Sequence, residues 1–73
     1  MIRLHELKIG DKASIHSFDN LADRHARKLL ALGVMPGMVV TVLQLSPTFV
    51  IQLEYAQLAI DREIAFHILV QKK

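Results

Sequence analysis

The chain of 73 residues contains no cysteine, no tryptophan and only three glycines. Without cysteine, disulfide bonds, thiol catalysis, iron–sulfur clusters and zinc ribbons are excluded. The G-x-S-x-G elbow, the P-loop and the Rossmann glycine pattern are also missing. A domain of this size buries only roughly 60% of the surface of its unfolded chain. The sequence therefore predicts one non-enzymatic domain over residues 1–73, without a cofactor.

The sequence has neither a large excess of one sign of charge nor a long uninterrupted apolar run. Nine Lys and Arg stand against seven Asp and Glu, a formal net charge of +2. Two of these cations, Lys72 and Lys73, lie at the chain end, so the body is nearly neutral and no nucleic-acid partner is expected. The uncharged residues 29–53 include both prolines and two glycines, which excludes a membrane-spanning helix and direct membrane insertion. Without a leader pattern at its start, the chain is predicted to be cytoplasmic.

One amphipathic helix is predicted after Asp19 and Asn20. Either residue can cap it, and with Asn20 as the cap Asp23 falls at the third helical position, near the positive helix end. At 100° per residue one half of this helix is apolar, formed by Leu21, Ala22, Ala26, Leu29, Leu30 and Leu32. The opposite arc holds Arg24, Arg27 and Lys28. Gly33 then suits the left-handed residue that ends a helix.

The rest of the chain carries short β patterns. Strands are predicted over residues 12–18, 38–45, 48–54, 57–61 and 67–71, with a helical turn at 62–65. Pro36-Gly37 predicts a type II turn, and the first ten residues are expected to lie across one end of the core. Together these elements predict a mainly β fold, a small curled barrel with one inserted amphipathic helix.

Three stretches resemble the ferrous iron transport protein A (FeoA) family: Leu29-Leu30-x-Leu32-Gly33-x-x-Pro36-Gly37, the opening Leu4-x-x-Leu7-Lys8-x-Gly10-Asp11-Lys12-Ala13, and the ending Ala65-x-His67-Ile68-Leu69-Val70. The same module occurs at the C-terminus of iron- and manganese-dependent repressors. The resemblance implies an SH3-like barrel that acts as an accessory of bacterial ferrous iron uptake. Its implied partner is the GTPase region of the membrane iron permease. Departures at Asp61, at Tyr55-Ala56 and near Pro47 put partner choice in doubt.

Two groups of residues are candidates for contact with a partner. The first is the segment Leu32, Gly33, Val34, Met35, Pro36, Gly37 and Met38, in which an exposed Met can repack against an apolar surface. The second is the basic helix face of Arg24, Arg27 and Lys28, which suits an acidic surface. The alternatives are that Val34 and Met35 cover the end of the barrel and that the basic face is only solvated.

The four histidines do not show the spacing of a metal site. His5, His16, His25 and His67 form no H-x-x-x-H, H-x-H or E-x-x-H pattern. His25 falls in the apolar helix half and is expected to be half-buried, whereas His16 and His67 are expected to face solvent. No metal ligand is therefore predicted. A transition-metal-binding regulatory module of the repressor type stays as the alternative function, and a homo-oligomer stays open.

Overall fold

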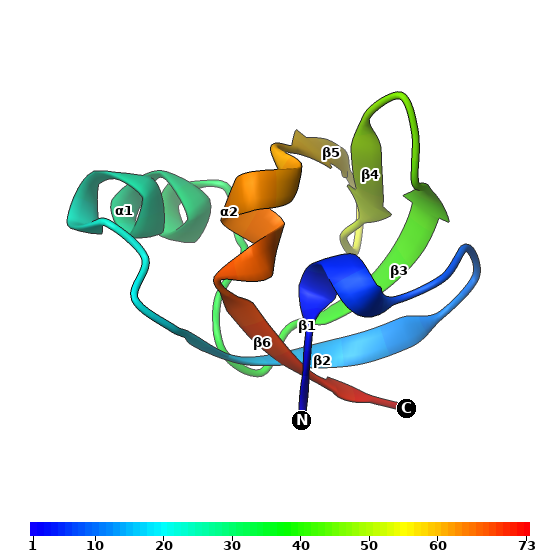
Figure 1. The fold of residues 1–73 in the computed structure, drawn as a ribbon, viewed down its shortest axis with the longest axis horizontal. Coiled ribbons are helices and arrows are strands. Elements are labelled where there is room, and N and C mark those ends of the chain that lie inside the picture. Colours follow the sequence, from blue (N-terminus) through cyan, green and yellow to red (C-terminus); the bar gives the residue numbers. More distant parts are fainter.

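Six short strands form one antiparallel sheet in the order β1-β6-β2-β3-β4-β5 (Figure 1). The computed structural model describes every residue from 1 to 73. The strands are β1 Ile2–Arg3, β2 Lys12–Phe18, β3 Val39–Gln44, β4 Phe49–Gln52, β5 Gln57–Ile60 and β6 Ile68–Lys72. Because β1 and β5 stand at the two ends of this order, the sheet curls around its core without hydrogen-bonded closure.

Helical segments connect the strands (Figure 1). The 3-10 helix η1 covers Leu4–Glu6, α1 covers Asp23–Ala31 between β2 and β3, and α2 covers Arg62–Phe66 between β5 and β6. The helical turn predicted near residue 62 is thus a five-residue helix. The prediction of a mainly β fold with one inserted amphipathic helix is confirmed.

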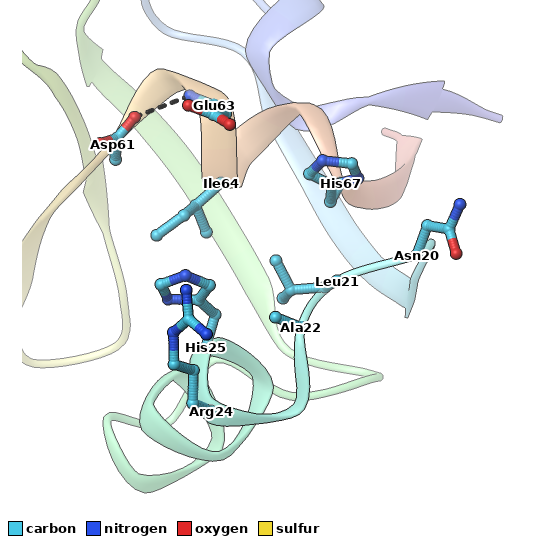
Figure 2. A pocket seen from close by; sticks show the side chains of 9 residues that line it. All are labelled: Asn20, Leu21, Ala22, Arg24, His25, Asp61, Glu63, Ile64 and His67. Carbon is cyan, nitrogen blue, oxygen red and sulfur yellow. Dashed lines mark hydrogen bonds between the residues drawn. The ribbon is translucent and has the colours of Figure 1, made fainter.

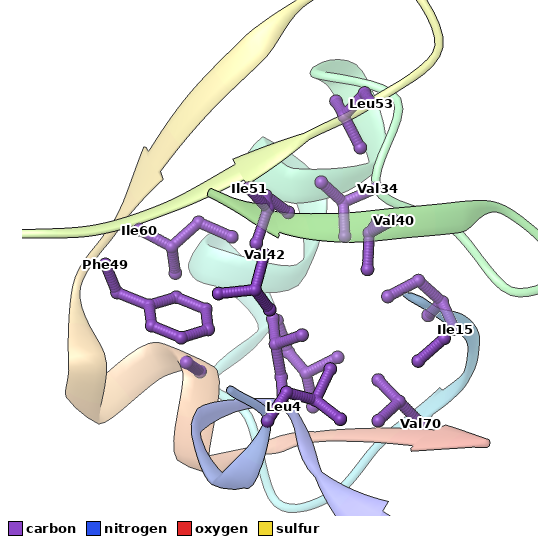
Figure 3. Packing of buried hydrophobic residues seen from close by; sticks show 14 of the residues in the cluster. Leu4, Ile15, Val34, Val40, Val42, Phe49, Ile51, Leu53, Ile60 and Val70 are labelled. Atoms are coloured by element: carbon purple, nitrogen blue, oxygen red, sulfur yellow. The ribbon is translucent and has the colours of Figure 1, made fainter. Parts of the chain in front are cut away.

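The core is wholly apolar (Figure 3). No polar or charged residue is buried. Alternate residues of the strands supply most of it, so that Ile15 from β2, Val42 from β3 and Ile51 from β4 meet inside the curled sheet. The predicted inward face of Phe49, Ile51 and Leu53 is confirmed, because all three are buried.

The start of α1 differs from the prediction. The helix begins at Asp23, and Ala22 holds the cap position without a side-chain hydrogen bond. Asn20 adopts a left-handed φ of 61°, and the Asp19 carboxylate lies 3.1 Å from the Arg3 guanidinium. The prediction of a helix cap at Asp19 or Asn20 is therefore wrong, because the Asp19 carboxylate pairs with Arg3 of the N-terminal segment instead.

The end of α1 follows the prediction. Gly33 has a φ of 95°, the Val34 amide donates to the Leu29 carbonyl, and the Gly33 amide donates to the Leu30 carbonyl. This pair of bonds is the Schellman motif, and buried Val34 and Leu29 supply its apolar contact. The type II turn at Pro36-Gly37 is confirmed by the 3.1 Å bond from the Met38 amide to the Met35 carbonyl and by the φ of 95° at Gly37.

A groove between α1 and the β5–α2 segment

A groove separates α1 from residues 58–67. It consists of two adjoining hollows of about 440 and 390 Å³, which share His25, Asp61 and Ile64. Figure 2 shows the first hollow, in which Arg24 and His25 rise from α1 toward the start of α2. The groove joins parts of the chain that lie far apart in the sequence, because β5 begins 26 residues after α1 ends.

The floor of the groove is apolar. Its side chains come from both walls and are Leu21, Leu29, Leu32, Leu58, Ile60 and Ile64. Leu29 and Ile60 belong to the buried core, whereas Leu32 is 46% exposed. The groove thus opens the edge of the core to solvent.

Only one residue within α1 is buried. Leu29 enters the core, but Leu30 stays 43% exposed. The predicted apolar half of the helix is therefore only partly covered. Of the apolar side chains on and next to α1 that the core leaves exposed, only Leu32 lines the open space between α1 and β5.

Charge is divided between the two walls. On α1, Arg24 and Lys28 are exposed and form no ion pair, whereas Arg27 pairs with Asp23 at 2.9 Å and does not line the groove. On the opposite wall, the Asp61 carboxylate accepts a 2.9 Å hydrogen bond from the Glu63 amide and caps α2. The free cations of the groove are therefore those of α1.

The structure divides the predicted partner-binding residues between two places. Arg24, Lys28 and Leu32 line the groove. The turn at Pro36-Gly37 lies apart from it and is fastened to β2, because Gly37 donates to the Ile15 carbonyl at 2.8 Å. Met35 at this turn is 40% exposed.

Val34 is a correction to the predicted set. Its side chain is completely buried in the core, so it has no surface to offer a partner. This agrees with the alternative in which it covers the end of the barrel. Gly33 and Gly37 act through the backbone conformations of the helix end and the turn.

The histidines do not gather around a metal position. His16 is exposed, and half-buried His25 lines the groove, as expected. His67 does not face solvent as predicted, because it ends α2 half-buried with its Nδ1 2.9 Å from the Asp19 carbonyl. No three His, Asp or Glu side chains come together in a set that could hold a metal ion.

The β5–α2 wall of the groove was not predicted as a binding surface, and it includes Leu58, Ile60, Ala59, Ile64 and Glu63. Strand alternation identified the first two as apolar positions but gave no sign that α1 lies opposite them. Asp61 was noted as a departure from a family pattern. Only the position of α1 opposite a strand that comes much later in the chain reveals the site.

The model of the FeoA domain family matches residues 2–72. The chain belongs to the FeoA family. A crystal structure described as an iron uptake regulatory protein, FeoA, is 26% identical, with a TM-score of 0.88 over 99% of this chain and 97% of that one. Comparison with curated proteins gives no match.

Two further structures share the fold of this FeoA chain. Stenotrophomonas maltophilia FeoA, crystallised with zinc and described as an SH3 domain protein, is 23% identical, with a TM-score of 0.85 over 97% of this chain and 91% of that one. The IdeR protein of T. acidophilum is 21% identical, with a TM-score of 0.92 over 99% of this chain and 34% of that one. FeoA-like folds therefore occur alone and within longer proteins. Neither helix of the present chain has the length and apolarity needed to cross a bilayer.

Proposed function

We propose that this FeoA chain is a non-enzymatic accessory protein of ferrous iron transport that binds the cytoplasmic GTPase region of the membrane iron permease. The family match over residues 2–72 carries the proposal. Two relatives support it through their descriptions, one as an iron uptake regulatory protein and one as a candidate activating factor of ferrous iron transport.

The docking surface combines the turn and the basic side of α1. Leu32 and Met35 are 46% and 40% exposed, and the half-buried Met38 follows the turn. Arg24, Arg27 and Lys28 supply positive charge on α1, the helix that precedes this turn in the chain. A flexible Met can repack against an apolar partner, while the cations favour an acidic surface around it.

The mechanism is a shift of the partner's conformational equilibrium. A bound accessory changes that equilibrium only by the difference between its affinities for the two states. The turn at Pro36-Gly37 is hydrogen-bonded to β2 through Gly37 and Met38, so it presents Met35 on a backbone that is already ordered. The FeoA chain thus binds one state of the GTPase region more tightly and stabilises it.

Met35→Asp tests this surface. The variant is expected to fold and to lose association with the purified GTPase region by about tenfold or more, because it places a charge in an apolar contact. Calorimetric titration measures the affinity, and circular dichroism checks the fold. Leu43→Asp is the matched control, because Leu43 is 37% exposed on β3 and lies outside the proposed surface. Undiminished binding by folded Met35→Asp would remove the turn from the interface.

A further inference from the structure

Four of the nine cations of the chain lie together at one end of the curled sheet. Lys8 and Lys12 flank the turn that leads into β2, and Lys72 and Lys73 follow the buried part of β6. The Lys73 amide donates to the Lys12 carbonyl at 2.9 Å, and the Lys72 ammonium lies 3.6 Å from the Asp11 carboxylate. The two lysines at the chain end are therefore fastened beside this turn (Figure 1).

The carboxyl groups at this end do not cancel the four lysines. Asp11 is the one acidic side chain of the turn, and it already pairs with a lysine and accepts the Lys8 amide. Lys8, Lys12 and Lys73 form no ion pair. Glu54 borders a hollow with Lys12, but it follows β4 on the other side of β3. Even when the main-chain carboxylate of the last residue is counted, four ammonium groups face two carboxylates.

The position of Lys12 opposite Lys73 does not serve the stability of the sheet. Ala13 of β2 pairs with Lys72 of β6, so the next step of the register brings Lys12 and Lys73 together. Like charges directly opposite each other on neighbouring strands are destabilising. A negatively charged surface that covers both ammonium groups would remove this repulsion.

An apolar side chain projects from the same basic end. Ile9 is 65% exposed. Its turn is nevertheless firmly held, because the Asp11 amide donates to the Lys8 carbonyl at 2.9 Å. Gly10, with a φ of 89°, also donates to the Val42 carbonyl at 2.8 Å. The backbone therefore fixes Ile9 in its exposed position.

An exposed aliphatic side chain among lysines matches the chemistry of an anionic lipid surface. At a membrane interface apolar side chains enter the boundary between headgroups and acyl chains, while lysine stems lie along it and their ammonium groups stay with the phosphates. None of the four cations is an arginine, the residue suited to a bidentate pair with a carboxylate of a partner protein. A single-stranded nucleic acid would stack its bases on aromatic side chains, and residues 8–12 and 72–73 include none.

We infer that the end of the sheet formed by Lys8, Ile9, Lys12, Lys72 and Lys73 binds the surface of a membrane rich in anionic lipids, with Ile9 at the level of the headgroups. No segment of the chain crosses the bilayer in this contact. The inference goes beyond the proposed function and does not rest on it, because the contact needs lipid alone. α1 lies at the opposite end of the molecule, so it stays free for a protein partner (Figure 1).

Vesicle binding tests the inference directly. The full chain is sedimented with vesicles of equal parts phosphatidylcholine and phosphatidylglycerol, and with vesicles of phosphatidylcholine alone. Binding is expected to be saturable and at least about tenfold tighter to the anionic vesicles. It is expected to weaken with added salt, as the screening length falls from about 30 Å to about 8 Å. A spin-labelled lipid is expected to broaden the amide signals of Ile9 and Gly10 more than those of α1.

Matched double variants separate this end from net charge. Lys8→Gln combined with Lys73→Gln is expected to weaken binding to anionic vesicles by about tenfold. Arg24→Gln combined with Lys28→Gln makes the same change of net charge on α1 and is expected to weaken it by less than about twofold. Amide dispersion confirms that each variant is folded.

A second pair of variants tests the apolar contact. Ile9→Ser is expected to weaken vesicle binding by about fivefold, because it removes the side chain that enters the interface. Tyr55→Ser changes a side chain that is 92% exposed in the β4–β5 connection and is expected to have no effect.

Three results would overturn the inference. They are equal binding to both kinds of vesicle, equal losses in the two double variants, and tighter binding of a short duplex DNA that Ile9→Ser leaves unchanged, which would make the occupant a nucleic acid. The GTPase region is titrated separately, without lipid. If it binds while the vesicles do not, the membrane inference fails alone. If the vesicles bind while the GTPase region does not, the proposed function fails alone.

Discussion

Gly33 holds a backbone conformation that other residues resist. Its φ is 95°, and a Cβ added there would meet no atom within 4 Å. Any loss of stability on substitution of Gly33 therefore comes from its backbone conformation. Gly33→Ala is expected to lower the free energy of unfolding by about 1–2 kcal/mol, and Gly33→Asn by less. Urea denaturation measures both, and equal losses for Ala and Asn would contradict a left-handed origin.

Asp11 gives the chain a defined response to acid. The Lys8 amide donates to its carboxylate at 2.9 Å and, together with nearby Lys72, holds the pKa of Asp11 below its usual value. A carboxyl whose pKa falls on folding stabilises the folded state above its unfolded pKa, near ~3.9. That contribution is lost as the pH drops through the depressed folded pKa.

Asp11→Asn is therefore expected to lower the thermal midpoint near neutral pH and to approach the parent chain in strong acid. Thermal unfolding at several pH values below about 6 measures the difference. Glu54→Gln is the control, because exposed Glu54 makes no hydrogen bond or ion pair and its removal is expected to change nothing. A constant difference at every pH would show that Asp11 acts through packing.

At the scale of a single element, α1 is held to the core by one buried side chain. Leu29 is 5% exposed and is the only buried residue within the helix. Leu29→Ala is expected to lower the free energy of unfolding by about 2–5 kcal/mol, whereas Leu30→Ala at a surface position lowers it by less than about 0.5 kcal/mol. Denaturant unfolding measures both. Equal losses of unfolding free energy in the two variants would mean that both leucines hold α1 to the core.

Local signals predicted the elements well because their causes are local. Gly33 and Pro36-Gly37 determine the helix end and the turn through their own backbone preferences, and both features formed as expected. Strand alternation likewise identified the inward side chains. The predicted start of the helix was wrong because Arg3, sixteen residues upstream, forms an ion pair with Asp19.

The groove could not be predicted for a similar reason. Its walls are α1 and a strand that begins 26 residues after the helix ends, so no sequence window contains both. The sequence identified the cations of one wall and the exposed Leu32. It gave no sign of β5 as an open edge, because edge position depends on the order of strands in the whole sheet.

At the scale of the whole molecule, β6 holds the two ends of the chain together. It pairs with β1 on one side and with β2 on the other, and it carries buried Ile68 and Val70. Removal of residues 68–73 is expected to abolish folding, because β1 and β2 then lose their shared neighbour. Removal of Lys73 alone is expected to leave the fold intact. Amide NMR dispersion distinguishes the outcomes, and a dispersed spectrum from the longer truncation would contradict this role for β6.

The position of β6 also affects how the protein is made. A ribosome synthesises this strand after the five others, yet the sheet needs it between its first two strands. The nascent domain therefore emerges without the central strand that joins β1 to β2, and it completes its fold only once β6 has left the ribosome. A pause in translation before β6 emerges prolongs the exposure of the earlier strands to chaperones and proteases.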